Sequence, residues 1–241
     1  MQIYKYRKVT STQDLAKKYL ANKAQEIAAF IAQEQTAGYG KRGRSFYSPA
    51  KTGIYLSIAL PNFKFKLEHA GLLTIAIGVA VVHILQEQFP SYEFRLKWVN
   101  DIYLNDKKVA GILTEKIGLG LVIGIGVNIF TASFPKNISN HVCSIVQADY
   151  AFENMNEQLI RAVVQAANTY QNNKFLDEYR KISYLKSKVI TLKINHHYVT
   201  GRVVTIDDQG RLVISCRNST RCYSSGEVIK VELEPGFKGK Q

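Results

Sequence analysis

The chain has 241 residues, of which 46% are hydrophobic, so it can bury a sizeable core as one large domain or as a large domain with a smaller one. Its net charge of +13 predicts an anionic partner, such as nucleic acid, nucleotide phosphates or an acidic protein. Charge alone does not choose among these partners. No helix-turn-helix, RNP or zinc-finger pattern accompanies the charge, so nucleic-acid binding stays a secondary interpretation.

The expected location of the protein is the cytoplasm. The first twelve residues are polar, and no continuous apolar run reaches about 18 residues, which predicts neither a signal peptide nor a membrane span. Cys143, Cys216 and Cys222 are odd in number and lack the spacing of a zinc site, so we expect reduced thiols. The adjacent pair His196 and His197 has no third ligand nearby, and we assign it no role.

A first helix is predicted from Ser11 to about Lys23. Ser11-x-x-Asp14 forms a capping box ahead of helically spaced apolar residues. On the simplest interpretation Ser11 only caps this helix. The alternative is that the free amide groups of the helix N-terminus, together with the hydroxyls of Ser11 and Thr12, bind a polar ligand.

A basic, glycine-rich loop runs from Gln35 to Pro49, between apolar segments at residues 27–32 and 54–60 that are typical of strands. Its glycines and cations alternate: Gly38, Gly40 and Gly43 with Lys41, Arg42 and Arg44. Such a flexible, cationic backbone suits phosphate. The loop is not a true P-loop, because that motif opens a helix, whereas here a strand follows. The simpler alternative is a solvated basic hairpin.

The middle of the chain predicts one core helix and a meander of strands. Residues 69–88 are apolar on most faces, as expected of a helix packed across a sheet. Short apolar segments then alternate with turns at residues 94–98, 102–104, 109–117 and 121–129. No helix follows the last strand directly, so Gly124-x-Gly126 is not a dinucleotide fingerprint and instead indicates a close approach to the backbone.

Two helices, at residues 153–172 and 175–184, are predicted to close the main domain. Beyond Leu185 the pattern changes to short strands and turns, which predicts a small β-barrel. The fold class is therefore α+β, with a mixed, largely antiparallel sheet, helices and a small C-terminal β-barrel of the SH3-like kind. We place the domain boundary between residues 1–184 and 185–241.

Five sequence blocks together resemble the catalytic domain of the biotin protein ligases. The family typically shows S-T-N, Q-x-x-G-R-G-R-x-G-R-x-W, K-W-P-N-D, K-x-x-G-I-L and G-x-G-x-N. The matching blocks, in the same order, are Ser11-Thr12-Gln13, the glycine loop, Lys97-Trp98-Val99-Asn100-Asp101, Lys107 to Leu113, and Gly124-x-Gly126-Val127-Asn128. The C-terminal barrel also fits. Ser11 lies too near the start to leave room for a winged helix-turn-helix, so we expect a monofunctional ligase that does not bind DNA.

The resemblance implies a class II synthetase-like fold and a two-step reaction. The family joins biotin to ATP, forming biotinyl-5′-AMP and pyrophosphate, and then transfers the biotinyl group to a lysine of a biotin carboxyl carrier protein. It also implies Mg²⁺ as a cofactor and allows a homodimer. The alternatives are a lipoate or octanoate ligase or transferase of the same fold, or a non-catalytic basic module that binds nucleic acid.

The resemblance also assigns roles to individual residues. Lys108 would be catalytic, between the biotin carboxylate and the α-phosphate, where a fixed cation is needed. Residues implied to bind biotin are Ser11, Thr12, Gln13, Gln35, Tyr39, Gly40, Lys41, Lys108 and Gly111. Residues implied to bind ATP or the adenylate are Arg42, Arg44, Asn100, Asp101 and Asn128, with Asp101 also a ligand of Mg²⁺. The glycine loop would be a mobile lid over biotin.

The chain departs from the family pattern at five positions. Gln13 replaces an asparagine, Tyr39 and Lys41 replace arginines, Phe46 replaces a tryptophan, and Val99 replaces a proline. The loss of a cation at Tyr39 removes any side-chain guanidinium contact there. For the lysine pair, strand alternation predicts that Lys107 and Lys108 point to opposite faces, and the motif selects Lys108 as the one that faces the site.

Overall fold

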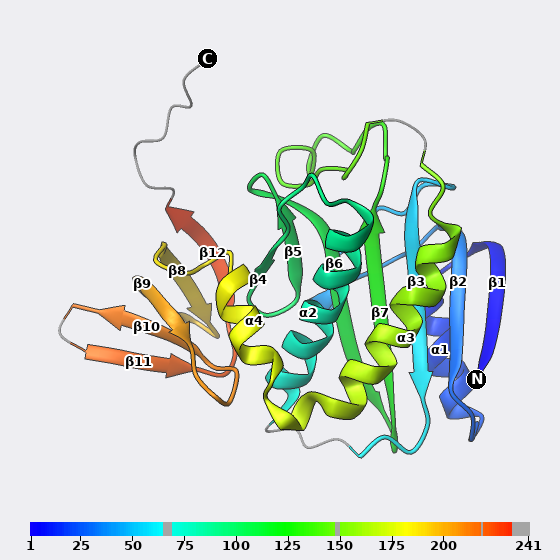
Figure 1. Cartoon of the computed structure of the whole chain (residues 1–241), viewed down its shortest axis with the longest axis horizontal. Coiled ribbons are helices and arrows are strands. Elements are labelled where there is room, and N and C mark those ends of the chain that lie inside the picture. The colour runs from blue at the N-terminus through cyan, green and yellow to red at the C-terminus, as the bar shows by residue number, and fades with distance from the viewer. Residues whose placement is uncertain (65–68, 148–149, 218, 233–241) are drawn as a thin grey trace.

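The computed structural model of the chain describes residues 1–64, 69–147, 150–217 and 219–232, and these form two sheets (Figure 1). The larger sheet has the strand order β1-β2-β3-β7-β6-β5-β4. Its strands are β1 (Gln2–Val9), β2 (Ala28–Gln35), β3 (Gly53–Leu60), β4 (Arg95–Lys97), β5 (Asp101–Leu104), β6 (Lys107–Ile117) and β7 (Gly120–Asn128). Strands β1 and β2 are parallel, and the other neighbours are antiparallel. The predicted mixed, largely antiparallel sheet is confirmed.

Helices cover both faces of this sheet. They are α1 (Thr12–Ala21), α2 (Ala70–Gln88), α3 (Glu153–Thr169) and α4 (Phe175–Ile182), with short 3₁₀ turns at Lys41–Gly43 and Tyr170–Asn172. Strand alternation divides β3: Leu56 and Ile58 join the main core with α2 and α3, whereas Ala59 packs with Ala16 of α1. The side chain of Ser57 faces the α1 side as well, because its hydroxyl contacts Thr12. The α1 face of the central strands therefore carries the polar groups of interest.

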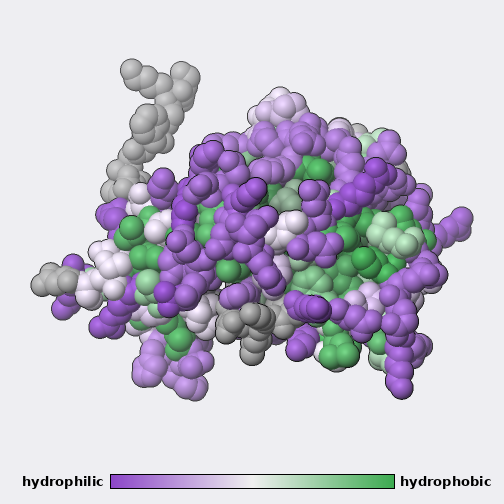
Figure 2. All heavy atoms as spheres, turned by 60° about the horizontal axis from the view of Figure 1, so that its bottom comes forward, coloured by the Kyte–Doolittle hydropathy of each residue, from purple (hydrophilic) through white to green (hydrophobic). Residues whose placement is uncertain are grey.

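Helix α2 is long and apolar enough to cross a membrane by length and composition alone, and it is the one such helix in the described ranges. Most of this helix is buried inside the protein, among the residues of the main core. A core helix that packs across a sheet has this composition because it is covered on most sides. Figure 2 shows one face of the molecule, where hydrophilic side chains surround scattered hydrophobic groups.

The smaller sheet has the strand order β11-β10-β9-β8-β12 and is antiparallel. Its strands are β8 (Val189–Ile194), β9 (His197–Ile206), β10 (Leu212–Cys216), β11 (Ser219–Tyr223) and β12 (Glu227–Glu232). It packs on the larger unit: Leu192 and Ile214 belong to the main core, and the indole of Trp98 donates to the carbonyl of Gly210 at 2.9 Å. The two sheets therefore lie against each other at the K-W-x-N-D motif.

The structure adds two strands that the sequence patterns did not predict, β1 and β11. In β1 most side chains are exposed, and in β11 almost all are, so neither strand shows the buried apolar face on which strand prediction depends. Both are edge strands, β1 beside β2 and β11 beside β10. Strands at an edge need less apolar surface than central ones, which explains why composition concealed them.

Candidate active site

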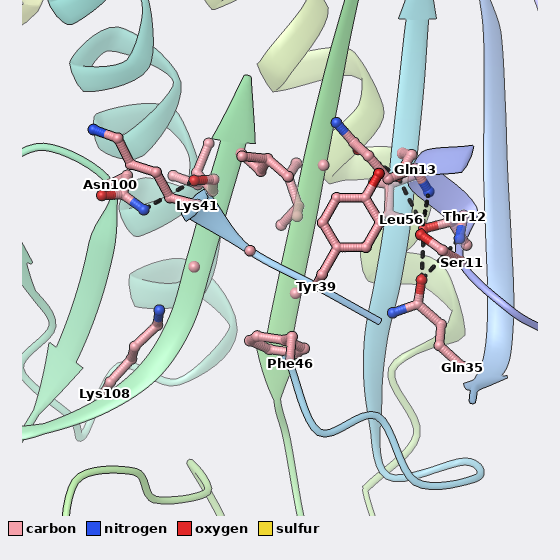
Figure 3. A pocket seen from close by; sticks show the side chains of 18 residues that line it. Ser11, Thr12, Gln13, Gln35, Tyr39, Lys41, Phe46, Leu56, Asn100 and Lys108 are labelled. Carbon is pink, nitrogen blue, oxygen red and sulfur yellow. Dashed lines mark hydrogen bonds between the residues drawn. The ribbon is translucent and has the colours of Figure 1, made fainter. Parts of the chain in front are cut away.

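A first pocket, with a cavity volume of about 50 Å³, lies on the α1 face of the larger sheet. Its walls are the N-terminus of α1, the central strands β3, β6 and β7, and the glycine loop (Figure 3). All nine residues expected to bind biotin line this pocket: Ser11, Thr12, Gln13, Gln35, Tyr39, Gly40, Lys41, Lys108 and Gly111. The structure therefore brings this predicted set together.

Hydrogen bonds between α1, β2 and β3 fix the polar wall of the first pocket. The backbone N–H of Thr12 donates to Gln35 Oε1 at 2.8 Å, and the Thr12 hydroxyl lies 2.9 Å from the Ser57 hydroxyl. The Ser57 hydroxyl donates to Gln13 Oε1 at 3.0 Å. Ser11 caps α1, since its side chain accepts hydrogen bonds from the backbone N–H groups of Gln13 and Asp14. Both interpretations of the capping box are thus compatible, because Ser11 caps the helix and also lines the pocket.

The glycine loop is a short, ordered hairpin that closes one side of the first pocket. Gly40 N–H donates to the carbonyl of Arg44 at 2.7 Å, and Phe46 N–H donates to that of Gly38 at 2.8 Å. Arg42 and Gly43 have φ values of 62° and 71°, a left-handed turn that glycine adopts at little cost. The loop thus combines the hairpin geometry of the simpler alternative with a position over a pocket.

A second, larger pocket, with a cavity volume of about 350 Å³, lies between the two sheets and adjoins the first. Its charged lining consists of five cations, Lys41, Arg42, Arg44, Lys97 and Lys108, and two carboxylates, Asp101 and Glu227. Burial lowers the pKa of Lys97, and burial together with the neighbouring Arg42 lowers the pKa of Lys41. Cations crowded in this way favour an anion with several charges.

The arginines of the glycine loop contact the smaller sheet. Arg42 and Arg44 both form ion pairs with Glu227, the first residue of β12. The hydrogen bond from Arg44 holds the pKa of Glu227 below its usual range. The positive charges of Arg44 and Arg42 lower this pKa further. The sequence analysis did not identify Glu227, because an isolated glutamate in a small strand carries no local signal of a contact made across the fold.

Lys108 lines both pockets. Its Nζ lies 2.7 Å from Asp101 Oδ1, and a Cβ placed on Gly111 would lie 3.0 Å from the same Nζ. Lys107, in contrast, is exposed and donates to the carbonyl of Ser139 at 3.4 Å. The opposite orientation of the two lysines agrees with the prediction.

A bulge in β6 is the reason that Lys108 faces the pockets. Ile102 pairs with Ala110 but Tyr103 pairs with Lys108, so Val109 is an extra residue, and both Val109 and Ala110 are buried in the core. Plain alternation back from Gly111 would have placed Lys107 on the pocket side. The bulge reverses this register and re-aims a single side chain, as bulges near functional sites often do.

Of the five residues expected to contact the nucleotide, four line the second pocket: Arg42, Arg44, Asn100 and Asp101. Asn128 does not line either pocket. It is 3% exposed, and its amide donates to the carbonyl of Cys143 at 3.4 Å. The side-chain amide of Asn100 donates to the carbonyl of Ile112 at 3.1 Å. Asn100 lines both pockets and so lies at their border.

No group of three or more His, Cys, Asp or Glu side chains that could hold a metal ion exists within the ranges that the structure describes. Magnesium, however, commonly binds through one or two carboxylates together with substrate phosphates, and Asp101 at the wall of the second pocket is suited to that arrangement.

The two adjoining pockets, one with directed hydrogen bonds and one with a cluster of cations, define a class of protein that binds a small polar molecule beside a polyanion. Residues 5–128 match the model of the Biotin/lipoate A/B protein ligase family, and residues 188–231 match that of the Biotin protein ligase C terminal domain. The chain belongs to the Biotin/lipoate A/B protein ligase family. The resemblance noted in the five motifs, and the ligase class that it implies, are thereby confirmed.

Curated relatives of this family are similar to the chain over most of its length. It is 29% identical to the biotin--[acetyl-CoA-carboxylase] ligase of Mycobacterium tuberculosis, across 83% of this chain and 77% of that protein. It is 27% identical to the bifunctional ligase/repressor BirA of Escherichia coli, across 89% and 71%. The biotin protein ligase of Aquifex aeolicus, solved in complex with biotin and ATP, has the same fold, with a TM-score of 0.84, 24% identity and coverage of 94% and 97%.

Proposed function

We propose that this chain is an ATP-dependent biotin protein ligase, which activates biotin as biotinyl-5′-AMP and then transfers the biotinyl group to a lysine of a biotin carboxyl carrier protein. The observation that carries the proposal is the position of Lys108 in the lining of both pockets. A carboxylate that enters from the first pocket and a phosphate that enters from the second would meet at this cation. Joining those two groups is the chemistry of adenylate formation.

In the first pocket, biotin would bind as a neutral ring with a charged tail. The amide and hydroxyl groups of Thr12, Gln13 and Gln35 offer donors and acceptors at fixed positions, which suit the ureido group. The apolar part of biotin would lie against the ring of Phe46, which lines the same pocket. The valeryl carboxylate would then point to the cationic end at Lys108.

In the second pocket, the triphosphate would bind to the cations of the glycine loop. Arg42 and Arg44 would exchange the carboxylate of Glu227 for phosphate oxygens, which guanidinium groups bind with two parallel hydrogen bonds. Lys108 would likewise leave Asp101 and neutralise the charge that develops between carboxylate and α-phosphate. Most of the rate gain would come from positioning and charge, as in other phosphoryl-group chemistry.

Magnesium would accompany the nucleotide. Asp101 would hold it together with phosphate oxygens, and the ion would supply charge neutralisation of the leaving pyrophosphate. Once Lys108 turns to the reacting groups, the Asp101 carboxylate would lose its ion-pair partner and could bind another cation. The same residue thus pairs with a lysine in the structure and would pair with magnesium during the reaction.

The glycine loop would protect the adenylate from water. An acyl-adenylate hydrolyses readily, so a ligase gains from a lid that closes on it until the acceptor lysine arrives. Residues 38–46 form this wall of the first pocket and also supply arginines to the second. Closure over both substrates would therefore be a single movement.

The acceptor would be a carrier protein in the cytoplasm. Two of the chain's relatives carry the name biotin--[acetyl-CoA-carboxylase] ligase, which supports a biotin-dependent carboxylase as the source of that carrier. The net charge of +13 would favour an acidic carrier surface. A homodimer is an additional expectation that sedimentation can test, and neither pocket includes a residue that would require it.

Pyrophosphate exchange tests this function. The purified chain, Mg²⁺, ATP and labelled pyrophosphate should give labelled ATP only when biotin is added, and biotinyl-AMP should remain bound to the protein. Exchange that requires lipoate or octanoate and not biotin would favour the other ligases of the family. No exchange with any of the three acids, together with tight binding of nucleic acid, would favour the non-catalytic basic module.

A further inference from the structure

We propose that Lys17 and Glu115 are positioning residues for biotin, which act on the first pocket through Gln13 and Tyr39. The inference rests on the proposed function of that pocket. Neither residue lines the pocket, and the family motifs assign a role to neither. Both are nevertheless connected to the lining by short hydrogen bonds that run from the floor of the pocket to its lid.

Glu115 fixes the orientation of the Gln13 amide. Gln13 Nε2 donates to Glu115 Oε2 at 2.9 Å, and a carboxylate can only accept, so the amide nitrogen must face Glu115. Gln13 Oε1 is thereby directed to the other side, where it lies over Gly124: a Cβ on that glycine would be 2.4 Å from this oxygen. Glu115 therefore decides that Gln13 presents an acceptor, and not a donor, above the floor of the pocket.

The neighbouring hydroxyls would by themselves favour the opposite orientation of the Gln13 amide. Three oxygen–oxygen contacts connect Gln35, Thr12, Ser57 and Gln13 in series, at 3.0, 2.9 and 3.0 Å. Two hydroxyl protons, those of Thr12 and Ser57, must serve these three contacts. A flipped Gln13 amide would donate to Ser57 and supply the missing proton. The hydrogen bond to Glu115 opposes that flip, and without it we expect the amide to turn.

Lys17 connects this arrangement to the lid. Its Nζ lies 2.8 Å from Glu115 Oε1 and 2.8 Å from the hydroxyl of Tyr39, which in turn donates to Asp14 at 2.7 Å. Burial lowers the pKa of Lys17, but its hydrogen bonds with Glu115 and Tyr39 outweigh that effect and raise it, so the ammonium stays charged at neutral pH. Lys17 thus neutralises the charge of the partly buried Glu115 and also holds Tyr39, the lid residue that follows Gly38.

Tyr39 takes the place where the family pattern has an arginine. An arginine would repel Lys17, whereas the tyrosine hydroxyl accepts from Lys17 and donates to Asp14. The aromatic ring also lies beneath the Lys17 ammonium, at 5.1 Å from its centroid. The replacement at position 39 and the lysine at position 17 therefore form a matched pair, which keeps the backbone of Gly38 to Gly40 against the pocket.

Direct binding of biotin to the full chain, measured by calorimetry, tests the proposal. We expect K17M and E115Q each to weaken biotin binding by about tenfold, the usual cost of losing a hydrogen bond to a charged group. The Michaelis constant for ATP should change less, within about twofold, because the hydrogen bonds of Lys17 and Glu115 reach Gln13 and Tyr39 of the first pocket and no cation of the second. K17R, which keeps the cation, should restore most of the affinity. K18M, the same change at an exposed neighbour in α1, should bind biotin like the parent.

A double-mutant cycle tests the route through Tyr39. Y39F and K17M remove the two ends of one contact, so the double variant should lose little more biotin affinity than K17M alone. Y47F, the same change at an exposed tyrosine just beyond the lid, should have no effect. Because Y39F deletes a single hydroxyl, this arm remains informative if a charge substitution prevents folding.

The outcomes separate this proposal from the proposed function. If the parent chain binds no biotin, the function of the pocket is wrong and the inference fails with it. If the parent binds biotin and K17M, E115Q and Y39F bind it equally well, only the inference fails. Equal losses for biotin and ATP would also overturn it, since they would indicate a general structural role.

Discussion

The linings of the two pockets differ in how their polar groups are held. In the first, the polar side chains of Gln13, Ser57 and Thr12 hydrogen-bond to one another. In the second, the cations are paired with carboxylates of the protein, Arg42 and Arg44 with Glu227 and Lys108 with Asp101. On the proposed function, a triphosphate would displace those partners. Directed hydrogen bonds in the first pocket would then bind the neutral ring of biotin, and exchangeable ion pairs in the second would bind the polyanion.

The largest expected effect is at Lys108, which lines both pockets, as Lys41 also does. K108A should lower the single-turnover rate of adenylate formation by about a hundredfold, because it removes a cation aimed at charge that develops in the transition state. K107A should remain within a few-fold of the parent, since that side chain is exposed and donates to the carbonyl of Ser139, away from both pockets. Rapid quench with labelled ATP measures both rates.

Equal rates for the two lysine variants would contradict this assignment and the bulged register of β6 that supports it. Circular dichroism of K108A serves as the control for folding. Loss of the rate with an unchanged biotin affinity would place the effect in the chemical step, and not in the first pocket.

A methyl group in the floor of the first pocket should disturb biotin alone. In G124A the new Cβ would lie 2.4 Å from Gln13 Oε1, and Gln13 cannot easily move because Glu115 and Ser57 hold it. We expect about a tenfold weaker affinity for biotin in calorimetry, with ATP little changed. G71A, whose Cβ would have its nearest neighbour at 3.9 Å, is the matched control. A G124A variant with parental affinity would show that the amide of Gln13 is free to adjust.

The concentration of salt should affect the binding of ATP more than the binding of biotin. Between 50 and 500 mM KCl we expect the Michaelis constant for ATP to rise about fivefold, because ions screen the attraction between the cation cluster and phosphates. The dissociation constant for biotin should change less than about twofold, since neutral hydrogen bonds fix its ring. A steep salt dependence for biotin as well would mean that its carboxylate dominates binding, and the contrast between the pockets would fail.

The smallest expected effect concerns the lid. Trypsin should cleave after Lys41, Arg42 or Arg44 in the free protein, and biotin with ATP should slow this cleavage by about threefold by holding the hairpin closed. Gel densitometry over a time course measures the rates. Identical rates with and without ligands would describe a static hairpin, because the loop already forms backbone hydrogen bonds in the structure.

Sequence patterns predicted the parts of this molecule that depend on local order. The buried strands β2, β3 and β7 and the helices α1 and α2 follow from periodicity and capping, whereas the exposed edge strands β1 and β11 lack an apolar face. The motif residues were found because their order along the chain is characteristic.

The partners of those motif residues could not be predicted in the same way. Glu115 lies 102 residues from Gln13, and Glu227 lies 183 residues from Arg44, so only the folded chain brings each pair together. The bulge at Val109 has the same character, because pairing with β5 creates it and no residue type announces it. Position along the chain identified the groups that would contact ligands, and the fold identified the groups that hold them.

A crystal structure of the chain with a non-hydrolysable analogue of biotinyl-AMP tests the central claim most directly. The account predicts the biotin ring beside Gln13, the nucleotide among the cations between the two sheets, and the bridging phosphate at Lys108, with Arg42 and Arg44 released from Glu227. A ring bound between the sheets, or a phosphate distant from Lys108, would contradict the division of the site into two pockets that adjoin at Lys108.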